Sequence, residues 1–372
     1  MFDKSLLSRA VESGIISAEQ RDKLIAFAVS DGSVSAMGEG ASAVRDEAPR
    51  FFRSFNDLFI GLGVAILGFA LKYGAELVAS GSQQVVFFAL LGCAALFWLL
   101  AEWITGIRRI NFPSIVILLF FIYFLGDGLR IGWEYYLLDG RIIQNTADTL
   151  QARGVVLISF ALTAAMALYF WRFRLPFSVL MLAATIALSL LALLLYGFGP
   201  EALMPFMRWI VLALGLAIFV AAMYFDTQDP ERSHRTSDHG FWLHLLAAPI
   251  ITHSILWSSL QPLISNQADA TSNANLMVIV VLGLFVVFSI VALVIDRRAL
   301  LISSLGYAAT ALGYIIYKFD VEGNVALVIT MLLIASLILT LGTGWYRLRR
   351  GVFALLPPSD FYQKLPPVTQ KV

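Results

Sequence analysis

The chain has 372 residues, of which 59% are hydrophobic and only 14% are charged. Soluble domains usually contain about 25% charged residues, so this composition excludes an ordinary soluble globular protein. A formal net charge of +1 gives no reason to expect nucleic-acid binding as the main activity. Cys93 is the single cysteine, which excludes an intrachain disulfide and a cysteine-based metal site.

The pattern of apolar and capping residues in 1–30 predicts a small helical hairpin on the cytoplasmic side of a membrane. Apolar residues repeat on one face of a first helix, which Gly14 can terminate. Ser17 and Gln20 then fit a capping box at the start of a second helix. Residues 31–54 are rich in small and polar residues, which indicates a flexible linker. Because the N-terminal stretch lacks an apolar signal-peptide core, the first membrane span is expected to act as its own insertion signal.

Ten apolar segments follow, each about long enough for a helix to cross a hydrocarbon layer of about 30 Å. They cover approximately 57–79, 84–104, 112–137, 153–171, 176–196, 203–225, 241–263, 275–295, 299–317 and 324–346. The expected fold is therefore an all-α, polytopic membrane protein with about ten transmembrane helices over 55–347. Residues 348–372 are expected to form an extended, Pro-containing cytoplasmic tail.

Arginines recur at every second boundary between these segments and predict the orientation of the chain. One side carries Arg108, Arg109, Arg172, Arg174, Arg232, Arg235, Arg297, Arg298, Arg347, Arg349 and Arg350 as loop and tail charges. The other side carries only Arg141, Arg153 and Lys318. Since cytoplasmic loops are enriched in Lys and Arg, we expect both termini in the cytoplasm.

Charged residues inside the predicted spans are the candidate substrate-binding residues: Lys72, Glu76, Asp127, Arg130, Glu134 and Arg208. A rise of about 1.5 Å per helical residue places all of them in the periplasmic half of the bilayer. Ionisable groups in a membrane need a partner, water or a function. In the functional interpretation, the cations bind an anionic group while the carboxylates orient them or move protons. In the alternative, these residues pair with one another between helices or reach the membrane surface.

Pro249 and His253 are candidate gating residues in the seventh segment. Pro249 removes a backbone donor and predicts a kink. His253 lies near the middle of the segment and His244 near its cytoplasmic end, on opposite sides of the helix, so no two-histidine metal site is expected. A lone histidine in a membrane helix more often makes a hydrogen bond to another helix. We expect no metal, cofactor or catalytic residue.

Two motifs frame the linker: Gly14 to Gln20 (GIISAEQ) before it, and Phe55 to Leu58 (FNDL) after it. The second motif leads into a Gly-rich span over Gly61 to Gly68 (GLGVAILG), whose glycines Gly61, Gly63 and Gly68 suit close helix packing. This arrangement resembles an uncharacterised family of bacterial multi-pass inner-membrane proteins. The resemblance implies a bacterial inner membrane and brings no assigned activity. The hairpin also resembles short helical oligomerisation modules attached to membrane proteins.

Three functional hypotheses follow. The first is a transporter with a polar pocket in the periplasmic half of the bilayer, for a small-molecule or lipid substrate. The second is a membrane-embedded sensor or scaffold, in which residues 1–30 bind a cytoplasmic protein or self-associate. The third is an intramembrane lipid-modifying enzyme, which the lack of a His/Asp or carboxylate cluster near an interface disfavours. We therefore expect no enzymatic activity.

Overall fold

A computed structural model describes residues 7, 10–30, 55–79, 81–136, 144–229, 236–264, 274–318, 322–357, 362 and 365–366. The chain divides into two compact units, one formed by 1–44 with 369–372 and the other by 45–368.

The N-terminal unit contains a helical turn at 10–12 and the helix α2 (Ala18–Ser30). Gly14 lies between them with a φ of +71°, a left-handed conformation that glycine adopts without steric cost. The Gln20 amide donates to Ser17 Oγ over 3.1 Å, and the Ser17 amide donates to Gln20 Oε1 over 2.8 Å. These reciprocal bonds confirm the predicted capping box, because each satisfies one of the backbone donors left free at a helix start.

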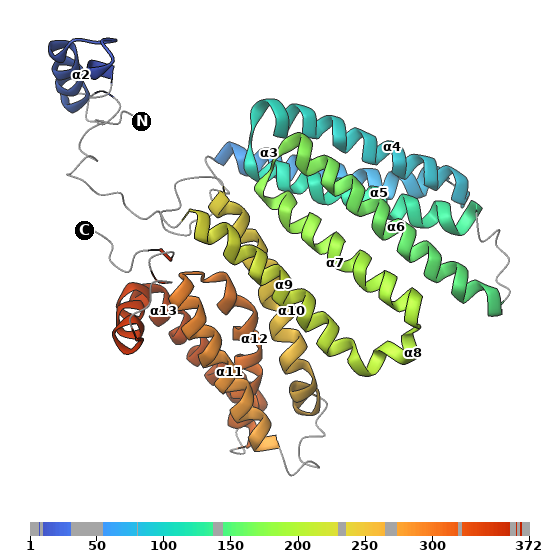
Figure 1. The fold of residues 1–372 in the computed structure, drawn as a ribbon. Coiled ribbons are helices and arrows are strands. Elements are labelled where there is room, and N and C mark those ends of the chain that lie inside the picture. Colours follow the sequence, from blue (N-terminus) through green and yellow to red (C-terminus); the bar gives the residue numbers. More distant parts are fainter. Residues whose placement is uncertain are drawn as a thin grey trace. The chain divides into compact units, whose positions relative to one another are not determined.

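The second unit is a bundle of long helices (Figure 1). In chain order these are α3 (Phe55–Ala79), α4 (Gln83–Ala101), the π-helix η1 (Glu102–Arg108), α5 (Asn111–Tyr136), α6 (Gln144–Phe173), α7 (Pro176–Phe198), α8 (Pro200–Leu203), the 3₁₀ helix η2 (Met204–Phe206), α9 (Met207–Gln228), α10 (Thr236–Ile264), α11 (Ala274–Ile295), α12 (Ala299–Lys318) and α13 (Gly323–Leu355). Eight of the ten predicted segments fall on a single helix, the third up to Tyr136; segment 84–104 continues from α4 into η1, and segment 203–225 runs from α8 through η2 into α9. The described ranges contain no strand.

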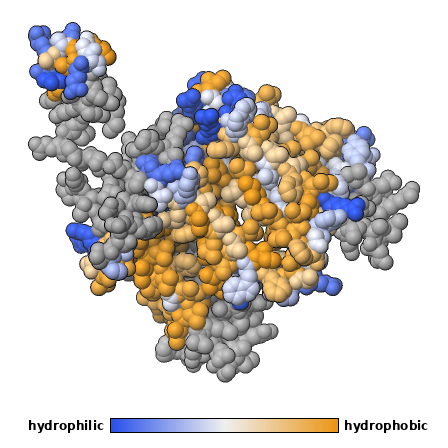
Figure 2. All heavy atoms as spheres, in the orientation of Figure 1, coloured by the Kyte–Doolittle hydropathy of each residue, from blue (hydrophilic) through white to orange (hydrophobic). Residues whose placement is uncertain are grey.

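Among the described residues, eight helices are long and apolar enough to cross a membrane: α3, α4 with η1, α5, α6, α7, α8 to α9, α11 and α13. α12 contributes a shorter apolar stretch, Ser304–Ile316, among the described residues. Large apolar side chains such as Leu77, Ile107 and Leu332 lie on the surface, and Figure 2 shows hydrophobic residues over much of the visible face of the helices. The chain is therefore an all-α polytopic membrane protein, while the number of ten crossings stays a prediction.

Helices adjacent in the sequence pack as pairs, α4 with α5, α6 with α7, α9 with α10 and α11 with α12. α3 packs on α5, α10 packs on both α7 and α12, and α13 packs on α12 and α11. The ring of Phe177 at the start of α7 contacts that of Trp242 near the start of α10, with centroids 4.6 Å apart. These contacts place the ends that carry the paired arginines together, and we call this the arginine-rich end of the bundle.

Three short turns at the arginine-rich end contain a non-glycine residue in the left-handed conformation. Arg109 joins η1 to α5 with a φ of 56°, Arg174 joins α6 to α7 with 49°, and Asp296 joins α11 to α12 with 57°. A left-handed residue with a Cβ costs roughly 1–2 kcal/mol. The packing of the helix pairs must offset this cost at each turn.

Two glycines of α3 accept aromatic rings of α5. A Cβ on Gly61 would lie 2.3 Å from the Phe112 ring, and one on Gly68 would lie 2.4 Å from the Phe120 ring. Close packing at these two positions is confirmed, with a ring rather than a second backbone filling the space. Gly63 has no neighbouring atom within 4 Å of such a Cβ, so the same prediction is wrong there.

Two of the arginines predicted to be loop and tail charges are buried. Arg297 retains 2% of its surface and Arg349 none. Arg349 also lies within α13, which continues to Leu355 and so includes the start of the segment predicted as an extended tail. Arg297 does lie in the turn between α11 and α12, as predicted, whereas the placement of Arg349 in a tail is wrong; each guanidinium is buried because it has acceptors inside the bundle.

Candidate functional site

Three charged residues form a line on one face of α5. Arg130 Nη2 lies 2.7 Å from Asp127 Oδ1, and Arg130 Nη1 lies 2.9 Å from Glu134 Oε1. Residues three and four apart on a helix are neighbours, which is why the three side chains meet. The Arg130 side chain is 52% exposed. The guanidinium is therefore neutralised by two carboxylates of its own helix, and the group carries a net formal charge of −1.

Lys72 of α3 faces the same helix at Tyr123. Its Nζ lies 5.5 Å from the centroid of the Tyr123 ring and 5.8 Å from that of Tyr73. Such distances fit attraction between a cation and an aromatic face. Within the described part of the chain, Lys72 has no ion pair, and Glu76 one turn further along α3 does not provide one. Lys72 is thus held by aromatic rings rather than by a carboxylate.

The predicted substrate-binding residues do not all contact the same neighbours. α3 and α5 pack together, so Lys72 lies against the helix that carries the Asp127, Arg130 and Glu134 group. Arg208 lies at the start of α9, where its guanidinium stacks 4.5 Å from the ring centroid of Trp209. α9 packs chiefly on α10. Lys72, Asp127, Arg130 and Glu134 therefore lie on the packed helices α3 and α5, whereas Arg208 lies on α9, and the role of these residues as a binding site stays a prediction.

The predicted gating residues lie on α10. The helix runs from Thr236 to Ile264 without interruption at Pro249. His253 Nδ1 lies 2.7 Å from the Tyr307 hydroxyl of α12. This is the hydrogen bond between helices that was the alternative to a gating role.

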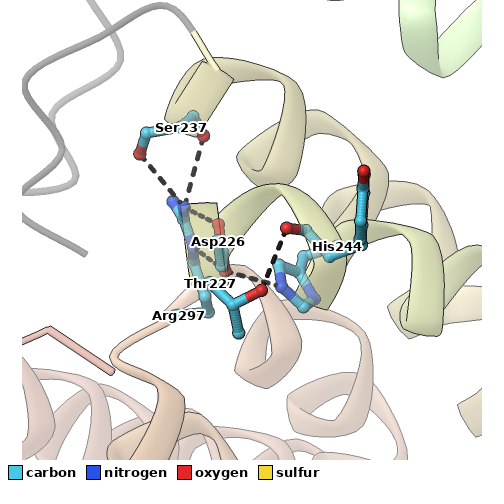
Figure 3. A network of polar contacts seen from close by, with 6 residues as sticks. Asp226, Thr227, Ser237, His244 and Arg297 are labelled. Carbon is cyan, nitrogen blue, oxygen red and sulfur yellow. Dashed lines mark hydrogen bonds and ion pairs between the residues drawn. The ribbon is translucent and has the colours of Figure 1, made fainter. Parts of the chain in front are cut away.

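A buried polar network at the arginine-rich end was not among the predicted sites (Figure 3). It joins Asp226 at the end of α9, Ser237 and His244 near the start of α10, and Arg297 in the turn before α12. Arg297 Nε donates to Asp226 Oδ2 over 2.9 Å, and Arg297 Nη2 contacts the other carboxylate oxygen. His244 Nε2 lies 2.9 Å from Asp226 Oδ2. All four residues are buried.

The network links three separate elements through one carboxylate. Arg297 Nη2 also reaches the carbonyl oxygen of Ser237 at 3.2 Å and its Oγ at 3.3 Å. A Cβ on Gly240 would lie 2.2 Å from Asp226 Oδ1, so the glycine gives the carboxylate its space. Buried charges are tolerated when paired and hydrogen-bonded, and removing one partner leaves the other uncompensated. The arrangement fixes the ends of α9, α10 and α11 relative to one another.

A second buried arginine lies beside this network. Arg349 of α13 donates to the carbonyl oxygen of Leu293 over 2.9 Å and to that of Pro366 over 2.6 Å. Trp345 Nε1, one turn earlier, donates to Asp296 Oδ1 over 2.6 Å. Cations favour the carbonyl end of a helix, so Arg349 stabilises the end of α11 and holds a residue of the C-terminal segment against it.

Sequence patterns gave only part of this network. Asp226 falls one residue beyond the sixth predicted segment, where a carboxylate is ordinary. Arg297 fits the alternation of loop arginines, and His244 has no nearby partner in the sequence.

No protein-family model, curated protein or solved structure matches the chain. In the described residues, no group of three or more His, Cys, Asp or Glu side chains is placed to hold a metal ion. The function has to be inferred from the geometry of the polar side chains within the apolar helices.

Proposed function

We propose that the protein transports a small anionic solute across a bacterial inner membrane, with Lys72 as the residue that contacts the solute. The observation that carries this proposal is the setting of Lys72 on α3. Its ammonium group lies among aromatic rings, within a helix apolar enough to span a membrane, and has no ion pair in the described part of the chain. An ionisable residue in such a helix marks a solute pathway by default.

Lys72, rather than the charged face of α5, is the feature that favours an anion over a cation as the solute. Arg130 is already neutralised by Asp127 and Glu134, which leaves Lys72 as the cation of this group without a counter-ion among the described residues. A charged side chain at the centre of a bilayer costs roughly 2.5–3.5 kcal/mol on insertion scales. Binding an anion at Lys72 reduces that cost, whereas binding a cation would increase it. The carboxylates hold Arg130 in place beside the pathway.

The arginine distribution supports an orientation with both termini in the cytoplasm. In that orientation Lys72 and the charged face of α5 lie in the periplasmic half of the bilayer, as the positive-inside rule predicts. Solute would then reach Lys72 from the periplasmic side. This proposal assigns the protein no enzymatic reaction.

Uptake into proteoliposomes tests the proposal. The purified full chain is reconstituted and the entry of radiolabelled acetate, phosphate and sulfate is measured against empty liposomes. We expect uptake of at least one anion, its loss in Lys72→Met, and its partial retention in Lys72→Arg. Arg347→Ala, which removes an exposed arginine of α13, is the matched control and should transport as the natural protein does. Uptake of none of these anions, or full uptake by Lys72→Met, would overturn the proposal.

The alternative function is a membrane-embedded sensor or scaffold. It is favoured by one observation, the independent N-terminal unit with its formed capping box. In this alternative, residues 1–30 bind a cytoplasmic protein or a second copy of the chain. Deleting residues 1–48 separates the two functions, since a transporter should retain anion uptake and a sensor should lose its cellular effect.

A further inference from the structure

A second polar cluster lies at the arginine-rich end, where α4 continues into the π-helix η1. Glu102 and Thr105 belong to η1, and Tyr169 and Arg172 belong to the last turns of α6. π-helical turns are rare and occur frequently at functional sites. The cluster lies at the arginine-rich end of the helices, whereas Lys72 lies towards their opposite end. The proposed function does not use it.

At the surface of the cluster, Glu102 and Arg172 form an ion pair. Arg172 Nη2 contacts Glu102 Oε2, and the side chains are 48% and 32% exposed respectively. The Arg172 guanidinium also stacks 5.4 Å from the ring centroid of Phe173. Arginine presents paired donors that match the geometry of a carboxylate. The position at Arg172 therefore already accepts a carboxylate, one that belongs to the chain itself.

Below the ion pair lie two buried hydroxyl groups that face each other. Tyr169 retains none of its surface and Thr105 only 7%. Among the described residues, neither Tyr169 OH nor Thr105 Oγ1 makes a hydrogen bond of ordinary length and angle. Leaving a buried hydroxyl without a hydrogen bond is unfavourable, because the group has lost its bonds to water. An acceptor that entered between them would be favourable.

The ring of Tyr169 packs among other aromatic rings. The Tyr169 ring lies 4.5 Å from the Phe173 ring, 5.6 Å from that of Phe121 and 5.7 Å from that of Trp98, measured between centroids. The cluster thus combines a cation at the surface, two hydroxyl donors inside and an apolar wall. A short-chain monocarboxylate matches these features, because its oxygens accept hydrogen bonds and its alkyl group packs on rings.

We infer that Arg172, Thr105 and Tyr169 form a binding site for a small monocarboxylate. Glu102 occupies the guanidinium when the ligand is absent and withdraws when the ligand binds. The inference rests on the proposed function, the transport of an anion. It specifies the solute as a monocarboxylate and adds a second binding step at the arginine-rich end. The binding itself is independent of transport.

Equilibrium binding of radiolabelled acetate to the full chain in lipid nanodiscs tests the inference, at constant ionic strength maintained with sodium chloride. Glu102→Gln removes the competing charge while keeping the side-chain shape, so acetate affinity should rise several-fold. Arg172→Gln should abolish binding. In the Glu102→Gln background, Tyr169→Phe and Thr105→Val should each lower the affinity several-fold, because each removes one hydroxyl donor. Glu201→Gln, at an exposed position near the opposite end of α7, should bind as the natural chain does.

Two results would overturn the inference. One is an affinity in Glu102→Gln no higher than in the natural chain. The other is unchanged binding after both hydroxyls are removed, with thermal melting showing that the variants are folded; this would mean an ordinary surface ion pair. Failure here is distinguishable from failure of the transport proposal. Loss of uptake in Lys72→Met without an effect of Glu102→Gln rejects the carboxylate site alone, and acetate binding without any uptake rejects transport alone.

Discussion

Arg297, in the turn between α11 and α12, holds the Asp226 carboxylate at the end of α9 through two of its nitrogen atoms, although 71 residues separate the pair. Both residues are buried, and His244 reaches the same carboxylate from α10. The ion pair therefore joins the two C-terminal helix pairs of the bundle.

Breaking this ion pair from either side should destabilise the bundle. We expect Arg297→Ala and Asp226→Ala each to lower the free energy of unfolding by about 3–5 kcal/mol, because each leaves a buried charge uncompensated. Unfolding in mixed micelles with increasing SDS measures this. The double variant Asp226→Leu with Arg297→Met carries neither charge and should lose less than the sum of the two single changes. Strict additivity would show that the two residues do not stabilise the bundle as a pair.

The glycines of α3 provide a matched pair for testing how α3 packs on α5. Gly68→Ala places a methyl group 2.4 Å from the Phe120 ring, whereas Gly63→Ala meets no atom within 4 Å. Overpacking typically costs about 1–3 kcal/mol, so only the first change should lower the melting temperature in detergent. A smaller side chain at the ring position, as in Phe120→Leu, should partly restore Gly68→Ala. Equal melting of the two alanine variants would contradict the observed packing.

Removing Arg349 should release the C-terminal segment. The guanidinium donates to the Pro366 carbonyl, and Leu365 beside it is buried. In Arg349→Ala we expect faster hydrogen exchange at the Leu365 amide, which donates to the Tyr362 carbonyl oxygen, since the contact of this segment with the end of α11 is lost. Arg350→Ala is the control, because Arg350 is exposed on the same helix. If the two variants exchanged at the same rate, Arg349 would not be what holds the segment.

The orientation of the chain can be tested with single cysteines in a Cys93→Ala background. Arg108 and Glu201 are exposed at opposite ends of the bundle. In intact cells, a membrane-impermeant maleimide should label Glu201→Cys and leave Arg108→Cys unlabelled until the membrane is permeabilised. The reverse pattern would show that the arginine-rich end faces outward, against the positive-inside rule.

Hydropathy predicted the helices because long apolar runs have few alternatives in a membrane. The fifth predicted segment, 176–196, corresponds to α7, which ends at Phe198. The last segment was harder. Charged residues near 347 indicated an end, yet α13 continues to Leu355 because Arg349 is neutralised inside the bundle and Phe353 packs on the ring of Tyr362.

Some residues of the candidate sites could be predicted from the sequence, and others could not. Lys72 and the charged face of α5 could be found from the sequence, since a charge inside an apolar run is visible without a structure. The pairing of Asp226 with Arg297, and that of Glu102 with Arg172, could not. Each joins residues on different helices that lie at ordinary helix ends, where hydropathy and local spacing carry no information about the partner.

At Arg109 and Arg174, the backbone conformation favours glycine, whereas the orientation of the helices in the membrane favours a positive charge. Glycine would adopt the same backbone conformation at a lower steric cost, but it would remove a positive charge that keeps the turn on one side of the membrane. Replacing both by glycine should therefore yield a chain whose turns form more readily and whose insertion direction is less certain. At these two positions the chain keeps a strained backbone conformation, and the charge retained in return helps to orient the helices in the membrane.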